Sequence, residues 1–177
     1  MKTLTCCFTG HRPQKFHFGV DEQHRDCVRL KRVLEAQIKA MIDQGITTFY
    51  SGMALGTDMW CAQIVQAFQE NMPERDIRLI AVVPFEGQAD RWSHDFRARY
   101  CSILAKATEV VTLNARYNMA CMQQRNRHMV DRASHVIAVY SGAPGGARYT
   151  VEYARGKNRT LVIIDPGSGS ATIQPPV

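Results

Sequence analysis

Short apolar segments alternate with amphipathic helical segments along most of the chain. Apolar residues at positions 27, 30, 34, 38, 41 and 42 recur at helical spacing and predict a long helix. Residues 77–83 are almost wholly apolar, as is typical of a strand covered on both faces of a parallel sheet. The same criteria predict strands near 4–9, 46–50, 77–83, 109–113, 135–140 and 159–165, and helices near 21–43, 59–69, 89–106, 119–132 and 147–155.

This alternation predicts an α/β fold made of right-handed strand–helix–strand units. We expect an open, doubly wound parallel sheet of about six strands with helices on both faces, and a barrel fragment is the alternative. Residues 1–165 are expected to form a single domain. The tail, 166–177, holds Gly, Ser and Pro without an apolar pattern and is expected to be disordered.

Composition and charge narrow the class of protein only slightly. Of the 177 residues, 45% are hydrophobic and 21% are charged, as in an ordinary globular protein. The chain shows no membrane-spanning apolar run and no signal-peptide pattern, so we expect a cytoplasmic protein without a membrane partner. The six cysteines lack zinc-ligand spacing, which favours buried free thiols and no metal site. The formal charge of +6 favours acidic partners without demanding nucleic acid.

The stretch Ser-Gly-Met-Ala-Leu-Gly-Thr-Asp at 51–58 joins a predicted strand to a predicted helix. Gly52 and Gly56 permit backbone angles and close approaches that a Cβ would prevent. Thr57 or Asp58 could cap the helix, whose free N–H groups and positive dipole end suit an anionic ligand. A well-capped connection without any ligand explains the same residues equally well. The spacing is neither G-x-G-x-x-G nor that of a Walker P-loop.

The unusual loops all follow predicted strands. In an open parallel sheet these loops meet at the carboxyl edge, where ligands bind at the switch point. The loops are residues 9–13, 51–58, 84–88, 114–118 and 141–146, so we expect a ligand site there. Its candidate binding residues are Gly10, His11, Arg12, Ser51, Gly52, Gly56, Thr57, Asp58, Pro84, Gln88, Trp92, Arg125, Asn126, Gly142, Gly145 and Gly146.

Several of these side chains have both a functional and a structural interpretation. Arg12 could clamp a phosphate or carboxylate through two parallel hydrogen bonds, whereas a structural hydrogen bond or solvent exposure better explains His11. Asp58 would repel a phosphate placed directly against it and suits a ribose hydroxyl better. Gln88 and Trp92 could hydrogen-bond and stack on a base, although a core position is the simpler explanation for Trp92.

Polar residues on the last two predicted helices also need an explanation. Arg125 and Asn126 interrupt an apolar stripe. A buried polar group without a partner costs roughly 1–3 kcal/mol, so either a neighbouring loop or a ligand must satisfy them. Glu152 has Arg148 at i−4 and Arg155 at i+3, and a solvated ion-pair face explains all three.

Taken together, and in their order along the chain, the motifs resemble the YpsA-like branch of the SLOG superfamily up to Asp165. They are Phe-Thr-Gly-His-Arg-Pro at 8–13, the stretch at 51–58, Val-Pro-Phe at 83–85, Gln-Arg-Asn at 124–126, and Gly-Gly at 145–146 followed by Thr-Val-Glu-Tyr-Ala at 150–154. The resemblance implies a Rossmann-like fold and a nucleotide-like phosphate ligand of nucleoside phosphate, NAD or ADP-ribose type, bound in a sensing or regulatory role. It implies no settled activity and no certain cofactor.

Two better understood branches share parts of these motifs. Residues 51–58 resemble Ser-Gly-x-Ala-x-Gly-x-Asp of the DNA-processing protein A family, which implies single-stranded DNA as an alternative partner. Residues 144–146 with Glu152 resemble Pro-Gly-Gly-x-Gly-Thr-x-x-Glu of the Lonely Guy phosphoribohydrolases. That similarity implies cleavage of the N-glycosidic bond of nucleoside monophosphates, with Glu152 and Arg125 as catalytic residues. This chain has Arg-Tyr where that motif has Gly-Thr, which alters the phosphate-binding turn.

We therefore rank binding of a small nucleotide ligand above hydrolysis and above DNA binding. Against DNA, the sequence shows no clear basic stripe with interleaved aromatic residues, which is the usual means of holding a strand. The sequence leaves open whether the protein forms a homo-oligomer.

Overall fold

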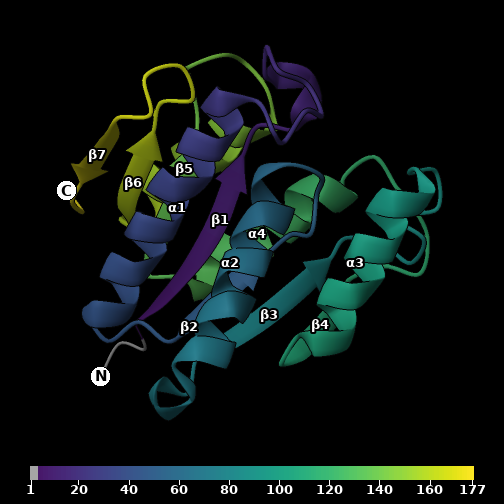
Figure 1. Cartoon of the computed structure of the whole chain (residues 1–177), viewed down its shortest axis with the longest axis horizontal. Helices are drawn as coiled ribbons and strands as arrows, with labels where there is room; N and C mark the ends of the chain where they lie inside the picture. Colours follow the sequence, from purple (N-terminus) through teal and green to yellow (C-terminus); the bar gives the residue numbers. More distant parts are fainter. Residues whose placement is uncertain (1–3) are drawn as a thin grey trace.

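The computed structural model describes residues 4–177 and contains one sheet of seven strands in the order β4-β3-β2-β1-β5-β6-β7 (Figure 1). Neighbouring strands are parallel except β6 and β7, which are antiparallel. The strands are β1 (Thr5–Gly10), β2 (Thr48–Ser51), β3 (Arg78–Val83), β4 (Glu109–Thr112), β5 (His135–Val139), β6 (Thr160–Ile164) and β7 (Ala171–Gln174). The helices are α1 (Arg25–Asp43), α2 (Thr57–Asn71), α3 (His94–Lys106), α4 (Cys121–Arg132) and α5 (Gly146–Gly156), with short 3-10 helices η1 (Pro13–Lys15) and η2 (Pro73–Arg75).

Helices cover both faces of the sheet, with α1, α2 and α3 in front and α4 behind in the view of Figure 1. Because side chains alternate along a strand, Cys6 and Phe8 pack beneath α1 and α2, whereas Cys7 packs beneath α4 and α5. The predicted open, doubly wound α/β sheet is confirmed, and the barrel alternative is wrong. The six cysteines are free thiols and all but Cys101 are buried. Within residues 4–177, no helix combines the length and hydrophobicity needed to cross a membrane.

The structure corrects the predicted starts of two helices. α1 begins at Arg25, later than predicted, because His24 is its N-cap and accepts the N–H of Asp26 at 3.2 Å. Ser93 caps α3 in the same way, so that helix begins at His94. Apolar periodicity does not reveal where a capping side chain stops the helix, which explains both errors.

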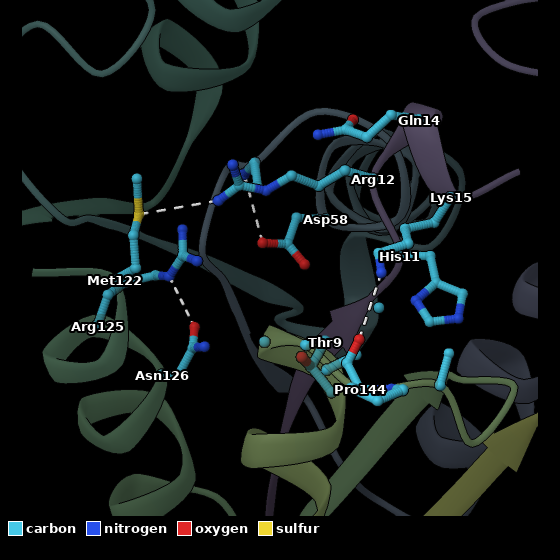
Figure 2. A pocket seen from close by; sticks show the side chains of 16 residues that line it. Thr9, His11, Arg12, Gln14, Lys15, Asp58, Met122, Arg125, Asn126 and Pro144 are labelled. Carbon is cyan, nitrogen blue, oxygen red and sulfur yellow. Dashed lines mark hydrogen bonds between the residues drawn. The ribbon is translucent and has the colours of Figure 1, made fainter.

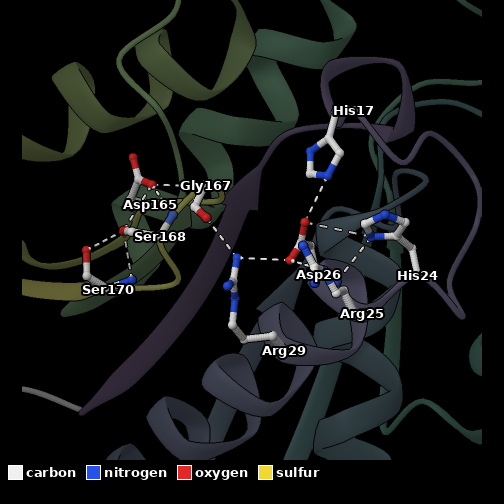
Figure 3. Close-up of polar contacts among 9 residues, drawn as sticks. All are labelled: His17, His24, Arg25, Asp26, Arg29, Asp165, Gly167, Ser168 and Ser170. Atoms are coloured by element: carbon white, nitrogen blue, oxygen red, sulfur yellow. Dashed lines mark hydrogen bonds and ion pairs between the residues drawn. The ribbon is translucent and has the colours of Figure 1, made fainter.

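The tail beyond Asp165 is not disordered, which corrects the prediction from sequence. Its strand β7 pairs antiparallel with β6. In the connecting turn, Asp165 Oδ1 accepts the N–H groups of Gly167 and Ser168 at 2.9 and 2.7 Å. Arg29 of α1 donates to the carbonyl oxygen of Gly167 at 2.7 Å (Figure 3). Most side chains of β7 are exposed, so backbone pairing rather than apolar burial orders the tail.

The direction of winding reverses between β1 and β5. Strands β2, β3 and β4 lie on one side of β1, and β5 and β6 lie on the other. The loops that leave β1 and β5 therefore diverge and open a crevice at the carboxyl edge of the sheet. This is the position at which the sequence predicts a ligand site.

Candidate functional site

A cavity of about 260 Å³ lies at the carboxyl edge, between the loop after β1, the turn after β2, α4 and the start of α5 (Figure 2). The predicted residues that line it are Gly10, His11, Arg12, Asp58, Arg125, Asn126, Gly145 and Gly146. The predicted residues that do not line it are Ser51, Gly52, Gly56, Thr57, Pro84, Gln88, Trp92 and Gly142. Four distant segments of the chain thus converge on one cavity.

The turn after β2 supports the cavity through its own hydrogen bonds. Ser51 Oγ donates to the carbonyl oxygen of Asp58 at 2.9 Å. Thr57 Oγ1 donates to the carbonyl oxygen of His11 at 3.0 Å and ties this turn to the loop after β1. The N-cap of α2 is Gly56, without a side-chain hydrogen bond, so the prediction that Thr57 or Asp58 caps the helix is wrong. Thr57 binds the loop after β1 instead, and Asp58 accepts the N–H of Ala54 within its own turn.

The turn after β2 approaches α4 closely at Gly52. A Cβ on Gly52 would lie 2.5 Å from Arg125 Cδ and 2.8 Å from Asp58 Oδ2. The Gly52 carbonyl oxygen accepts hydrogen bonds from Arg125 Nη1 at 2.7 Å and from Gln88 Nε2 at 3.4 Å. Arg125 Nε donates to Asn126 Oδ1 at 2.9 Å. The turn after β2 therefore supplies a hydrogen-bond partner for Arg125, one of the two polar residues that interrupt the apolar stripe of α4. Arg125 and Asn126 both also line the cavity.

Asp58 is the only carboxylate among the residues lining the cavity, and Figure 2 shows it between Arg12 and Arg125. Its Oδ2 accepts the N–H of Ala54 at 3.3 Å, and its Oδ1 has no hydrogen-bond partner within residues 4–177. Burial raises the pKa of Asp58, and the charge of Arg125 opposes that rise. Burial lowers the pKa of Arg125, and the charge of Asp58 opposes that fall. The two buried charges stabilise one another.

Two cations and a helix start form the outer part of the cavity. Lys15 Nζ donates to the carbonyl oxygen of Pro144 at 3.3 Å, and Arg12 Nη2 contacts Met122 Sδ at 3.8 Å. In the described part of the chain, neither cation forms an ion pair. α5 has Gly145 as its N-cap and no side chain capping its first N–H groups. Free N–H groups at a helix start favour an anion.

His11 joins the loops after β1 and β5. Its Nε2 accepts the backbone N–H of Ser141 at 3.3 Å and lies 3.0 Å from Ser141 Oγ. The backbone N–H of His11 donates to the carbonyl oxygen of Val139. Burial, together with the charge of Lys15, lowers the pKa of His11, so the imidazole is neutral at pH 7. The structural hydrogen bond expected for this residue is present.

The predicted residues after β3 lie outside the cavity. Gln88 is buried and bridges the turn after β2 to the hydroxyl of Tyr100, 3.4 Å away. Trp92 packs edge-on against the same Tyr100 ring, with centroids 5.3 Å apart, which fits the expected core position. Pro84 is buried, and its carbonyl oxygen accepts a hydrogen bond from Asn114 at 2.9 Å. None of these side chains reaches the cavity lining.

Glu152 and Arg125, the residues expected to act together in hydrolysis, are placed apart. Arg125 lines the cavity, whereas Glu152 does not. Glu152 is exposed and pairs with Arg148 at 2.9 Å, one helical turn away. The ion-pair interpretation of Glu152 therefore matches its surroundings.

Lys15 is the charged cavity residue that sequence reasoning missed, and it was missed together with Gln14, Met122 and Ala147. It lies in η1, a single turn that begins at Pro13 and directs Lys15 towards Pro144. Proline favours the first position of a helical turn, so Pro13 was the available signal. Because the turn begins at Pro13, Lys15, two residues later, points back towards the carboxyl edge of the sheet.

Within the described residues, His17, His24 and Asp26 form a group whose metal-ligating atoms lie within 4.8 Å of one another (Figure 3). Their contacts already have a structural explanation. His17 Nε2 lies 2.9 Å from Asp26 Oδ2, and His24 Nδ1 uses its lone pair to cap α1. Arg29 lies 3.3 Å from Asp26 Oδ1 and supplies a positive charge that a metal ion would have to oppose.

Comparison with known proteins identifies the family. The chain matches the model of the YspA SLOG family, YpsA, over residues 6–163, and it belongs to this family. A UPF0398 protein of Bacillus velezensis is 26% identical over 164 residues, covering 90% of this chain and 87% of the relative. A UPF0398 protein of Halalkalibacterium halodurans is 28% identical over 159 residues, covering 88% and 81%. The resemblance drawn from the motifs is confirmed.

Solved structures of DNA processing protein A share the fold. The Streptococcus pneumoniae protein matches with a TM-score of 0.58 and 16% identity over 93% of this chain and 51% of that chain. The Helicobacter pylori protein, described for its single-stranded DNA binding mode, matches with a TM-score of 0.61 and 14% identity over 93% and 66%. The present chain thus spans about half of the first and 66% of the second. The likeness establishes a Rossmann-like fold.

The close approach at Gly52 predicts a specific loss of stability. In Gly52→Ala, the new Cβ displaces Arg125 from its bond to the Gly52 carbonyl oxygen and leaves buried polar atoms unpaired. We expect the free energy of unfolding, measured by urea denaturation, to fall by about 1–3 kcal/mol. Gly146→Ala is the matched control, because its Cβ meets nothing within 4 Å, and it should change stability by less than about 0.5 kcal/mol. Equal stability of the two variants would contradict this account.

Burial of Asp58 predicts a pH dependence. Burial raises the pKa of Asp58 in the folded state, so the native state binds a proton at this carboxyl more readily than the unfolded state does. Such a group contributes stability that is fully present below its unfolded pKa and is lost as pH rises through the folded pKa. We expect the unfolding free energy of the parent minus that of Asp58→Asn to fall as the pH rises above about 4, the usual pKa of an unfolded aspartate. Urea denaturation at several pH values measures this difference, and a constant or rising difference would disprove the assignment.

Proposed function

We propose that the cavity binds a nucleotide or a nucleotide-derived phosphate ligand, and that the protein acts through it as a sensor or regulator. One observation carries this proposal: Arg12 and Lys15, both without ion-pair partners in the described chain, converge with the uncapped start of α5. Cationic side chains and free helix N–H groups are the combination that recognises phosphate oxygens. Their position at the switch point of a Rossmann-like sheet agrees with this role.

The charges in the cavity also favour one orientation of the ligand. A phosphate near Asp58 would meet a like charge, whereas a phosphate at the start of α5 meets N–H groups and Lys15. Asp58 Oδ1 is without a hydrogen-bond partner in the described residues and can accept a hydrogen bond from a sugar hydroxyl. We therefore place the phosphate at α5 and the sugar towards Asp58, whose ionised form the charge of Arg125 favours.

Binding without bond cleavage is the function that the side chains support. A carboxylate near the ribosyl centre would be needed to stabilise positive charge during glycosidic cleavage. Glu152, the candidate from motif similarity, is outside the cavity and paired with Arg148. Asp58 Oδ2 accepts the N–H of Ala54 and is stabilised by the charge of Arg125, and we assign its Oδ1 to a sugar hydroxyl rather than to the ribosyl centre.

A panel of nucleoside phosphates, dinucleotides and ADP-ribose tests the proposal. A ligand at about 100 times its dissociation constant should stabilise the protein by about 2.7 kcal/mol, which thermal denaturation detects readily. For the best ligand, Lys15→Ala and Arg12→Ala should each weaken affinity by about tenfold or more in calorimetry, since hydrogen bonds to charged groups contribute about 1.5–3 kcal/mol.

The control is Arg75→Ala, which removes an exposed arginine from η2 at the amino edge of the sheet. It should leave nucleotide affinity unchanged. The proposal fails if no member of the panel stabilises the protein. The site is misplaced if both cavity variants bind the best ligand as tightly as the parent does.

A second candidate function is binding of single-stranded DNA, which we propose because the Helicobacter pylori protein with the same fold is described for it. The formal charge of +6 agrees with a polyanionic partner. We expect a labelled 20-nucleotide oligothymidylate to bind at about 50 mM salt, with log affinity falling linearly with log salt by about 0.7 per phosphate contact. Fluorescence anisotropy across a salt series measures this dependence. Absence of binding at low salt eliminates the DNA candidate.

A further inference from the structure

Two tyrosines and two cations form a row across α4 and α5, outside the cavity. Arg127 belongs to α4, Tyr149 and Tyr153 belong to α5, and Lys157 follows the last turn of α5; we call these four residues the Tyr–Arg patch. The tyrosine rings are nearly parallel, inclined by 10°, with centroids 6.4 Å apart. The Arg127 guanidinium lies 5.6 and 5.5 Å from the two centroids, and Lys157 Nζ lies 5.3 Å from that of Tyr153.

The two ends of the Tyr–Arg patch differ in charge. Asp131 accepts a hydrogen bond from the Tyr153 hydroxyl at 2.9 Å and lies 3.6 Å from Lys157 Nζ, so its carboxylate neutralises that end. Arg127 is exposed, donates to the hydroxyl oxygen of Tyr149, and pairs with no carboxylate within residues 4–177. An anion would therefore bind at the Arg127 and Tyr149 end.

That end adjoins the cavity. The N–H of Tyr149 donates to the carbonyl oxygen of Gly145 at 3.1 Å, so Tyr149 lies in the first turn of α5, whose start lines the cavity. Arg127 directly follows Asn126, which also lines the cavity. A chain of nucleotides leaving the cavity along α5 would meet Tyr149 and Arg127 first.

We propose that the Tyr–Arg patch is a binding surface for single-stranded nucleic acid, in which a base stacks on Tyr149 and Arg127 contacts a backbone phosphate. This inference rests on the second function proposed above. Aromatic faces beside cations are the usual means of holding a strand without sequence preference. From Tyr149 to Lys157 the helix rises about 12 Å, the length of about three or four nucleotides stacked at 3.4 Å.

The patch also explains why the sequence shows no basic stripe with interleaved aromatic residues. Arg127 and Tyr149 come from different helices and meet only because α4 packs beside α5. Tyr149, Tyr153 and Lys157 follow one another along α5 and just past its end, but Arg127, the cation that pairs with no described carboxylate, lies 22 residues before Tyr149, so no single run of sequence contains the complete patch. The main argument from sequence against a nucleic-acid partner was the lack of a basic stripe with interleaved aromatic residues, and the patch removes that argument.

The competing explanation is that the patch only holds α4 against α5. If the patch had only that structural role, variants of it would change the unfolding temperature. They would not weaken binding of an oligonucleotide with bases more than binding of one without bases. The experiment therefore compares a 20-nucleotide oligothymidylate with an abasic oligonucleotide of the same length, which keeps the phosphates and lacks the bases. Fluorescence anisotropy at several salt concentrations, with the unfolding temperature of every variant, separates the two explanations.

Tyr149→Leu keeps apolar volume but removes the ring, so it should weaken oligothymidylate binding by about fivefold or more and leave abasic binding unchanged. Tyr149→Phe keeps the ring and should bind both as the parent does. Arg127→Gln should weaken binding of both and reduce the magnitude of the salt slope by about 0.7. Arg75→Gln, which removes one exposed arginine elsewhere, should change neither binding nor the slope.

The outcomes separate this inference from the function on which it rests. If the parent binds oligothymidylate and both Tyr149→Leu and Arg127→Gln bind equally well, the patch is not the surface, although DNA binding stands. If Tyr149→Leu weakens oligothymidylate and abasic binding alike, the stacking role is wrong. If the parent binds neither oligonucleotide at low salt, both the DNA function and this surface are overturned. Because Arg127 is exposed, Arg127→Gln decides the matter even if Tyr149→Leu fails to fold.

Discussion

The hydrogen bond from Arg125 to the carbonyl oxygen of Gly52 is the contact on which the site depends. It joins α4, on one face of the sheet, to the turn after β2, and a side chain at position 52 would occupy the space of Arg125. Gln88 donates to the same carbonyl oxygen from the loop after β3. Three segments that follow three different strands are therefore held by one backbone oxygen, and the cavity takes its shape from this convergence.

The cavity combines a fixed inner half with an adaptable outer half. Asp58 and Arg125 are buried and held by hydrogen bonds, and each opposes the effect of burial on the other's pKa. Arg12 and Lys15 are more accessible to solvent and follow β1, with Lys15 in η1, beside the open start of α5. A rigid polar floor suits recognition of one chemical group, whereas long cations at the mouth can follow a phosphate as it enters.

The sequence was sufficient to predict the features of the fold that depend on apolar burial and on glycine. Strands β1, β3, β5 and β6 are largely buried and therefore carry a clear apolar pattern. β7 is mostly exposed and is ordered by backbone pairing and Arg29, so composition alone suggested disorder. Lys15 was missed because a single turn at Pro13 sets its direction. Glu152 was matched by motif, and a motif does not show which face of a helix meets the cavity.

The pairing of β1 with β5 has a consequence for how the protein folds. The contact between His11 and Ser141 spans 130 residues, and the strands beside it pair across a similar separation. Such contacts close long loops and slow folding relative to local contacts. During synthesis β2 can pair with β1, and β3 with β2, before the rest of the chain is made. The walls of the cavity meet only after α5 has emerged from the ribosome. An incomplete chain therefore presents no finished cavity, and the cavity is completed in the last stage of folding.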